Sequence, residues 1–197
     1  MGLPEVKNAK PEDKVRILSA ASLAFCADPF MRWVLPEPEA YLKKYADMID
    51  LYCCQKSLEN ASTFVVQRFG GVALWLPPGV HSDEEKISGW ITDNIDPVRL
   101  DVFGQVLREM ESYHPKTASC WYLAVLAVDP AFQRQGLGSV LMKHVNRILD
   151  EASCEGYLES SNPQNVSLYQ RHGYEIMGEI KIGDCPVVTP MLRRPAS

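Results

Sequence analysis

The sequence lacks the features that mark a metal protein or a membrane protein. It contains no Cys-x-x-Cys pair, and the six cysteines have no metal-ligand spacing. No apolar run approaches the roughly 18 residues needed to cross a bilayer, and the first residues contain no apolar signal-peptide core. Internal repeats and low-complexity tracts are also absent. We therefore expect free thiols, no bound metal, no membrane partner and a reducing, cytoplasmic location.

The composition is that of an ordinary globular domain. The chain has 197 residues, which is enough for one hydrophobic core and too few for two comfortable ones. We therefore expect a single domain over residues 1–197. Hydrophobic residues make up 46% and charged residues 23%, which are usual values. The formal net charge of −5 argues against nucleic acid as a partner and suits a cationic substrate mildly.

The stretch from Trp121 to Asp150 has the order strand, loop, helix. Residues 121–128 are an apolar run of strand length, and Asp129-Pro130 ends it. A polar loop follows, and from Leu137 onward apolar residues recur at three- and four-residue steps, which is helix spacing. The first turn of such a helix carries backbone N–H groups without partners inside the helix. These groups and the helix dipole favour binding of an anion there, phosphate above all.

The loop before this helix is suited to a pyrophosphate group. Gly136 and Gly138 have no side chains that would keep a phosphate from the backbone, and Arg134 adds a permanent positive charge. The loop is not a dinucleotide fingerprint, because Leu141 occupies the third glycine position, and no Lys-Ser/Thr pair follows as in a Walker A loop. From these residues alone, a strand-to-helix turn that merely needs small residues is an equally good interpretation.

The rest of the chain alternates between helical and strand patterns. Residues 1–10 suit a first strand or a loose arm, and residues 28–36 form an aromatic loop between two prolines. Apolar spacing predicts helices and strands; the helices lie at 11–28, 38–60, 83–95, 97–113, 137–150 and 163–172, and the strands at 63–68, 72–76, 121–128, 156–160, 174–182 and 187–192. This alternation predicts an α/β fold with a mixed strand order. Residues 80–113 form a helical insertion rich in carboxylates, which is either a solvated face or an attractor for a cationic substrate.

Two blocks in the second half resemble the GNAT superfamily of acetyltransferases. The pattern Val128-x-Pro130-x-x-Gln133-x-x-Gly136-x-Gly138 resembles the acyl-CoA-binding signature of that family. A second block agrees with it downstream and consists of residues 157–161, Asn165, Tyr169, Gly173 and Tyr174. The resemblance covers roughly residues 119–193. Within the superfamily, the chain looks most like the small-molecule N-acetyltransferases that include puromycin acetyltransferase.

The resemblance implies the GNAT fold, with a central, mixed and mostly antiparallel sheet flanked by helices and a V-shaped splay between the two central strands. It implies acetyl-CoA as co-substrate and direct transfer of the acetyl group to a primary amine of a small molecule within a ternary complex. A polyamine, an amino sugar, an aminonucleoside or another amine toxin would be a suitable acceptor. Homodimers are common among the proteins that this chain resembles. Two alternatives stay open: a protein or peptide N-acetyltransferase, and a catalytically silent acyl-CoA-binding module.

The resemblance also assigns residues to the acetyl-CoA site. The backbone N–H of Val128 would polarise the thioester carbonyl, and the loop amides of residues 134–139 would hold the pyrophosphate. Asn165 would contact the pantetheine, and Tyr169, one turn further along the same helix face, would protonate the leaving thiolate. The complete predicted set comprises Leu126, Ala127, Val128, Gln133, Arg134, Gln135, Gly136, Leu137, Gly138, Ser139, Asn165 and Tyr169.

For the acceptor side, Glu159 is the predicted general base, acting on the amine directly or through water. Its alternative role is that of a structural carboxylate, and His114, with an ordinary pKa of about 6.5, is an alternative base. The predicted substrate-binding residues are Phe30, Trp33, Tyr122 and Glu159. The aromatic segment that contains Phe30 and Trp33 would either cover the core or form a wall of the acceptor pocket.

Overall fold

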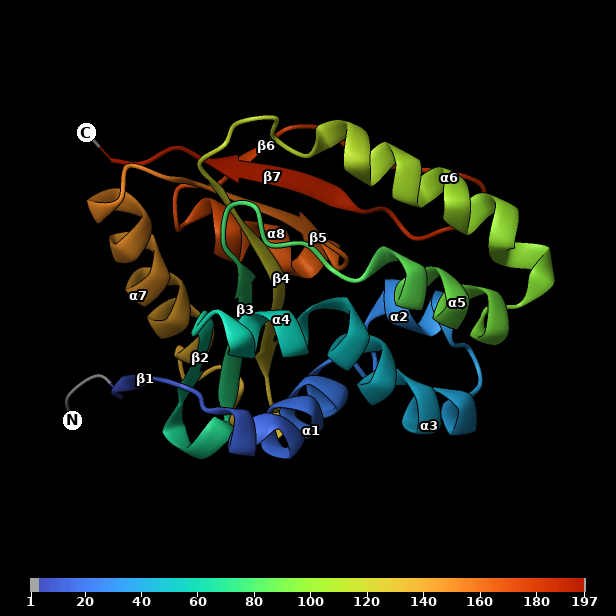
Figure 1. Cartoon of the computed structure of the whole chain (residues 1–197), viewed down its shortest axis with the longest axis horizontal. Coiled ribbons are helices and arrows are strands. Elements are labelled where there is room, and N and C mark those ends of the chain that lie inside the picture. Colours follow the sequence, from blue (N-terminus) through green and yellow to red (C-terminus); the bar gives the residue numbers. More distant parts are fainter. Residues whose placement is uncertain (1–3, 197) are drawn as a thin grey trace.

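The computed structural model describes residues 4–196, which are organised around one seven-stranded sheet (Figure 1). The strands are β1 (Val6–Asn8), β2 (Thr63–Val66), β3 (Gly71–Leu76), β4 (Cys120–Val128), β5 (Glu155–Ser160), β6 (Glu175–Ile176) and β7 (Thr189–Arg193). Their spatial order is β1-β2-β3-β4-β5-β7-β6. The β4–β5 pair is parallel and the other pairs are antiparallel. The predicted mixed, mostly antiparallel sheet is therefore confirmed.

The two central strands separate along their length. Strand β4 pairs with β5 from Cys120 to Leu123, while on its other side it stays paired with β3 as far as Val128. The second half of β4 therefore has no β5 neighbour. This is the predicted V-shaped splay, and it leaves backbone groups of β4 available between the two strands.

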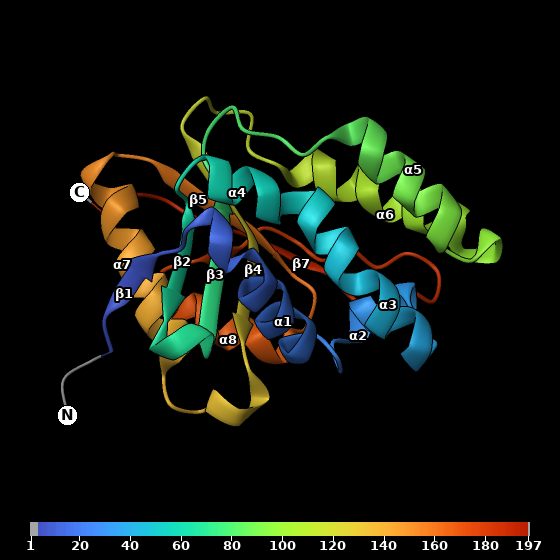
Figure 2. The same ribbon diagram turned by 60° about the horizontal axis from the view of Figure 1, so that its bottom comes forward.

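Helices cover both faces of the sheet. They are α1 (Lys14–Ala24), α2 (Pro29–Val34), α3 (Pro38–Ile49), the π-helical segment η2 (Asp50–Cys54), α4 (Gln55–Glu59), α5 (Glu84–Asn94), α6 (Pro97–Tyr113), α7 (Leu137–Glu151) and α8 (Pro163–Gln170). Short 3-10 turns occur at η1 (Pro11–Asp13), η3 (Gln67–Phe69) and η4 (Pro130–Phe132). The predicted helical insertion is present as α5 and α6, which lie side by side at the end of the molecule opposite α7 (Figures 1 and 2). None of the helices within residues 4–196 combines the length and the apolar character that a membrane crossing requires.

The sheet separates two hydrophobic cores. Alternate strand residues such as Val72 and Leu74 pack with α1, α3 and α6 on one face. Their neighbours Ala73 and Trp75 pack with α7 and α8 on the other. This follows from the two-residue period of a strand, which sends successive side chains to opposite faces.

The structure corrects the prediction of an aromatic loop at residues 28–36, because most of this segment is helix α2. The Asp28 side chain accepts a hydrogen bond from the backbone N–H of Met31 and so caps the helix. Pro29 stands at the first helical position, where its missing N–H costs nothing. The prolines had suggested the limits of a loop, whereas the first of them begins a helix.

Some apolar residues of the helices face solvent. In α1 the buried residues are Ile17, Ala20 and Ala21, whereas Val15 is 74% exposed. Leu42 of α3 is likewise exposed. The closing hairpin is shorter than predicted, since β6 has two residues and only the isolated bridge between Ile180 and Val188 extends it.

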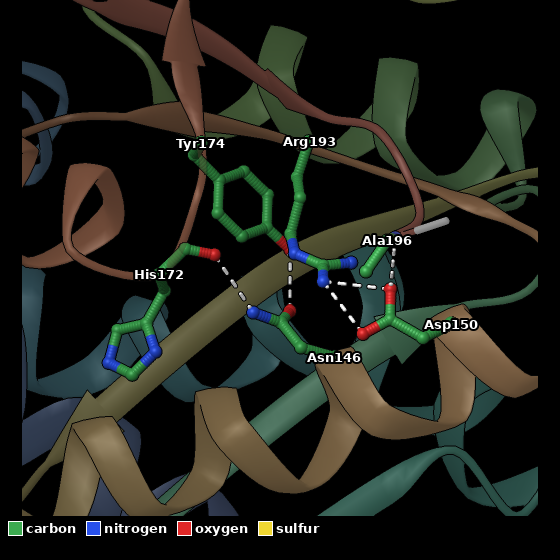
Figure 3. Close-up of polar contacts among 6 residues, drawn as sticks. All are labelled: Asn146, Asp150, His172, Tyr174, Arg193 and Ala196. Carbon is green, nitrogen blue, oxygen red and sulfur yellow. Dashed lines mark hydrogen bonds and ion pairs between the residues drawn. The ribbon is translucent and has the colours of Figure 1, made fainter.

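Polar contacts fix α7 against the C-terminal part of the chain (Figure 3). The Arg193 Nη2 atom lies 2.8 Å from both carboxylate oxygens of Asp150. Asn146 donates from Nδ2 to the backbone carbonyl of His172 at 3.0 Å, and the Tyr174 hydroxyl donates to its Oδ1 at 3.3 Å. These contacts join α7 to β7 and to the turn after α8, and so position the helix whose N-terminus forms the predicted phosphate site.

Candidate active site

The loop before α7 and the first turn of that helix border a groove of about 670 Å³. Arg134 and Gly136 have left-handed backbones, with φ of 61° and 80°. This conformation turns the chain sharply into α7, whose first amides have no partner inside the helix. A Cβ at Gly138 would lie 3.6 Å from Leu168 and 3.8 Å from Val128. It would therefore occupy the space between β4 and α8, through which a pantetheine chain would pass.

Most of the residues predicted to bind acetyl-CoA line this groove. It is lined by Leu126, Val128, Gln133, Arg134, Gly136, Leu137, Gly138, Ser139, Asn165 and Tyr169. Ala127 does not line it, because strand alternation buries the Ala127 side chain in the core on the α1 face. Gln135 is exposed outside it, with its Oε1 atom 3.5 Å from Gln67 Nε2. The signature residue Gln133 contacts the end of β4, since its Nε2 donates to the Val128 carbonyl at 3.2 Å.

Two arginines line the groove, and sequence-based prediction included only one of them. Arg134 precedes α7, whereas Arg171 follows α8 and lies near Ser167, whose hydroxyl is 3.3 Å from Arg171 Nη1. No pattern in the sequence connects two arginines that are 37 positions apart, because the tertiary fold alone places α7 and α8 on the same groove. Both guanidinium groups are available to a pyrophosphate or a phosphate.

A second cavity, of about 170 Å³, lies at the splay of the sheet. Its walls come from the splayed strands β4 and β5 and from α2, α3, η2, α5 and α6. Phe25, Leu126, Asn165 and Tyr169 line both this cavity and the groove. The groove predicted for acetyl-CoA and the cavity predicted for the acceptor therefore meet at these four residues.

Tyr169 is buried at this junction, with 8% of its surface exposed. Burial raises the pKa of its hydroxyl above the ordinary value, and the nearby carboxyl group of Asp28 adds to that effect. The phenol therefore stays protonated at neutral pH and is available as a proton donor. This is the state that the predicted role of Tyr169 requires.

Glu159 lies at another wall of the second cavity, in a chain of hydrogen bonds. The Tyr122 hydroxyl donates to Glu159 Oε2 at 2.6 Å, and the Tyr52 hydroxyl lies 2.5 Å from that of Tyr122. Burial raises the pKa of Glu159 to about 7, against the opposing effect of the Tyr122 hydrogen bond. The carboxyl group can therefore gain and lose a proton near neutral pH, as a general base must.

Tyr52 was not among the predicted site residues. It belongs to the π-helical segment η2, and its ring meets that of Tyr122 edge-on at 6.5 Å. A π-helical turn contains an extra residue and shifts the side chains after it around the helix axis. No local sequence signal marks the π-helical turn, so the position of Tyr52 could not be predicted from helical spacing.

Of the two aromatic residues predicted for the acceptor site, the structure places one in the cavity wall and the other behind it. Phe30 lines the second cavity. Trp33 does not line it, which corrects the prediction; this residue is buried behind the wall, with its ring 6.2 Å from Phe30 and 6.4 Å from Phe103. The helical form of α2 explains the difference, because residues three apart lie on the same side of a helix but at different heights.

His114, the alternative base, is half-buried rather than a surface residue. Its ring packs 4.8 Å from Tyr157 and 5.4 Å from Tyr122. It lines a third cavity together with Glu159. Burial lowers the pKa of His114, which is therefore neutral at pH 7.

Asp28 is a further residue that sequence-based prediction did not assign to the site. It is buried at the groove, where Ser161 donates from Oγ to its Oδ2 at 2.8 Å. Burial raises the pKa of Asp28, although the Met31 and Ser161 hydrogen bonds oppose this. The Asp-Pro pair could have indicated a helix cap. The contact with Ser161 could not be predicted in this way, because it joins residues 133 positions apart.

Among residues 4–196, no cluster of three or more His, Cys, Asp or Glu side chains could hold a metal ion.

Known proteins resemble this chain in sequence and in structure. The model of the Acetyltransferase (GNAT) family matches residues 46–174. An uncharacterized N-acetyltransferase of Schizosaccharomyces pombe is 23% identical over 186 residues, covering 85% of this chain and 73% of that protein.

Two solved structures extend the similarity over nearly the whole chain. A protein from Corynebacterium glutamicum, described as histone acetyltransferase HPA2 and related acetyltransferase, is 26% identical, with a TM-score of 0.68 and coverage of 98% and 97% of the two chains. The polyamine N-acetyltransferase of Drosophila melanogaster is 15% identical, with a TM-score of 0.65 and coverage of 98% and 100%.

Proposed function

The chain belongs to the GNAT family of acetyltransferases, and from this premise we propose that it moves the acetyl group of acetyl-CoA directly to a primary amine of a small molecule. One observation carries the proposal: the groove beside α7 and the cavity at the splay meet at Phe25, Leu126, Asn165 and Tyr169. A thioester held in the groove would therefore reach an amine held in the cavity. Holding two reactants together in this way can lower a barrier by about 7–11 kcal/mol.

Strand geometry supports a role for the Val128 amide at the thioester carbonyl. The neighbouring Asp129 amide donates to the Gly70 carbonyl on the β3 side. Successive amides of a strand point in opposite directions, so the Val128 N–H points toward the side from which β5 has separated. The Val128 carbonyl lies on that same side, where Gln133 reaches it. The Val128 N–H is thus placed to stabilise the negative charge that develops on the carbonyl oxygen.

In the proposed reaction, Glu159 takes a proton from the incoming ammonium group, and the neutral amine attacks the thioester carbonyl carbon. The tetrahedral intermediate then expels the thiolate as its C–S bond breaks, and the thiolate takes a proton from the Tyr169 hydroxyl. The second amine proton goes to the resulting tyrosinate, directly or through water, which leaves the amide product and restores Tyr169, while Glu159 releases its proton to solvent. This sequence needs no covalent enzyme intermediate and agrees with the raised pKa of Glu159.

The shape of the acceptor cavity favours a small molecule over a protein acceptor. Helices α2, α5 and α6 contribute its walls, whereas a peptide would need a long open groove. The proximity of Tyr169 to the groove and the raised pKa of Glu159 favour an active enzyme over a silent acyl-CoA-binding module. The cytoplasmic location and the homodimer stay predictions from the sequence.

The decisive experiment is acetyl-CoA binding by calorimetry, followed by release of free thiol with a panel of small amines. We expect binding, and turnover that depends on an added amine. Binding without turnover of any small amine would contradict the proposed reaction and favour the silent module or a protein acceptor. Failure to bind acetyl-CoA would contradict the assignment of the groove itself.

A further inference from the structure

The acceptor cavity has a mostly apolar wall. The side chains that enclose it include Phe30, Met48, Trp90, Phe103 and Met110, which come from α2, α3, α5 and α6. Its volume is about 170 Å³, while an engineered apolar protein cavity of about 150 Å³ holds one benzene molecule. The cavity is therefore large enough for a group of the size of one aromatic ring.

Within residues 4–196, Glu159 is the single charged side chain that lines this cavity. The neutral polar groups of the cavity are Ser160 on β5, Ser161 after it, Asn165 on α8 and the hydroxyls of Tyr45, Tyr52, Tyr122 and Tyr169. One ammonium group would thus find a carboxylate, but a second one in the same space would lose its water without a charged partner. Burial of an unpaired charge carries a large penalty. The hydroxyls of an amino sugar would face the same apolar wall.

The third cavity adjoins this space. Tyr52, Leu107, Met110, Tyr122 and Glu159 line both cavities, and the third cavity also carries Glu84 and Glu111. Both of these glutamates are exposed. Exposed carboxylates attract a cation from solution but hold it weakly, because water and salt screen them. They would favour the approach of any amine, and of a dication somewhat more than a monocation, but they would not offer a second ammonium group a buried partner.

We propose that the acceptor is a monoamine whose single ammonium group meets Glu159 and whose compact apolar body, of about six carbons, fills the cavity, and that polyamines and amino sugars are poor acceptors. This inference rests on the proposed function and narrows its substrate class. The apolar wall would contribute binding energy in proportion to the hydrocarbon that it removes from water.

The test compares kcat/KM among amines of matched length, measured by release of free thiol from acetyl-CoA. For propylamine, butylamine, pentylamine and hexylamine we expect a rise of about fourfold per added methylene until the cavity is full. Phenethylamine should match the best of them. The diamines 1,4-diaminobutane and 1,5-diaminopentane should fall about tenfold or more below the monoamines of equal length, and glucosamine should also be poor.

The outcomes separate this inference from the function on which it rests. A diamine or glucosamine that exceeds the matched monoamine would overturn the apolar-monoamine inference, while amine acetylation itself would stand. A flat response to chain length would overturn it as well. If no amine releases thiol although acetyl-CoA binds, the proposed function fails, and the acceptor inference fails with it.

A pair of variants provides a second measurement, which does not depend on which amine the wild-type protein prefers. Leu107 lines the cavity and is 38% exposed, so its position can accept a polar side chain without loss of the fold. Leu107→Glu should raise the kcat/KM ratio of 1,5-diaminopentane to pentylamine about tenfold, because it supplies the missing second carboxylate. The matched control Leu107→Gln should leave this ratio unchanged. An unaltered ratio in Leu107→Glu would contradict the inference.

The rim glutamates are tested in the same assay. Glu111→Gln should lower kcat/KM slightly for monoamines and somewhat more for diamines, because the attraction scales with the charge of the cation, and added salt should remove the difference. A selective loss with diamines that persists at high salt would show that the rim binds a second ammonium group, and this result would contradict a cavity built for monoamines. Acetyl-CoA binding by each variant verifies that the fold is intact.

Discussion

The side chain of Glu159 can exist in both protonation states near neutral pH. Burial raises its pKa to about 7, and the Tyr122 hydroxyl donates to it at 2.6 Å. An exposed glutamate titrates far below this pH and would be a weaker base. The position of this carboxyl group between the cavities thus gives Glu159 the protonation behaviour that the proposed reaction requires of its base.

Replacement of this carboxyl group should change the pH dependence of catalysis. A base acts in its deprotonated form, so kcat/KM of the wild type should fall as pH decreases below about 7. Glu159→Gln should lower kcat by about a hundredfold or more and abolish this limb. Glu155→Gln, on the same strand and outside the cavities, is the matched control. A pH profile that does not move would instead indicate His114 or a chain of waters as the base.

The tyrosines beside Glu159 position it and adjust its pKa. Removal of the Tyr122 hydroxyl in Tyr122→Phe takes away a hydrogen bond that favours the carboxylate. The pKa of Glu159 should therefore rise, and the acidic limb of kcat/KM should move to higher pH by about one unit or more. Tyr52→Phe, one hydrogen bond further away, should move it in the same direction by less.

Tyr169 is the predicted acid at the junction of the groove and the cavity. Tyr169→Phe should lower kcat by about a hundredfold with little effect on acetyl-CoA binding, because the ring still fills its place. Tyr113→Phe, on α6 and outside all three cavities, tests for a general effect of losing a phenol. Unaltered turnover by Tyr169→Phe would exclude the acid role, and calorimetry with acetyl-CoA separates binding from chemistry.

At the scale of elements, the N-terminus of α7 and the loop before it form the candidate phosphate site. Arg134→Glu should raise the KM for acetyl-CoA about tenfold, because a favourable charge becomes a repulsive one. The effect should diminish with added salt, since Arg134 is exposed. Arg147→Glu, the same change on the exposed side of α7, is the control. Equal KM values for the two variants would contradict the role of the loop.

The contact between β5 and α7 leaves no room for a side chain at Gly156. A Cβ there would lie 2.6 Å from the Tyr174 hydroxyl and 2.8 Å from Leu149 Cδ1. Gly156→Ala should therefore lower the free energy of unfolding by about 1–3 kcal/mol. Gly89→Ala, on the helix α5 with nothing within 4 Å of the added Cβ, should raise it by about 0.5–1 kcal/mol. Urea denaturation of both variants tests this difference.

At the scale of the whole molecule, the ion pair between Arg193 and Asp150 joins the C-terminal part of the chain to α7 (Figure 3). Partial burial would raise the pKa of Asp150, but the hydrogen bonds from the Ala196 amide and from Arg193 hold it below its ordinary value. A carboxyl group with a lowered folded-state pKa stabilises the fold above its unfolded-state pKa. That contribution disappears as pH falls through the folded-state pKa.

This linkage predicts a pH-dependent loss of stability in Asp150→Asn. At pH 7 the free energy of unfolding of the variant should be about 1–2 kcal/mol lower than that of the wild type, because Arg193 loses its charged partner. The difference should shrink below about pH 4, where the wild-type carboxyl group also becomes neutral. Glu151→Gln, at the next and exposed position, should show neither effect. A difference that stays constant with pH would contradict the role of the Asp150 charge.

The local sequence was sufficient to predict much of the fold of this protein and part of its candidate site. Period-two and helical apolar patterns predicted the sheet and the helical insertion at α5 and α6, and the glycines and Arg134 predicted the strand–loop–helix site beside α7. These features depend on neighbours within one or two turns of chain, whose spacing a sequence displays directly. The family resemblance added the splay of the central strands, and it also placed Glu159, Asn165 and Tyr169 as candidates.

Only the tertiary structure decided which side chains meet. Trp33 lies behind the cavity wall, Tyr52 joins Glu159 through Tyr122, and Arg171 faces the same groove as Arg134. The mostly apolar wall with a single carboxylate likewise depends on residues from six helical segments and two strands. Such contacts depend on the packing of elements far apart in the sequence, where a one-residue change of helical phase moves a side chain by about 100° around the helix axis.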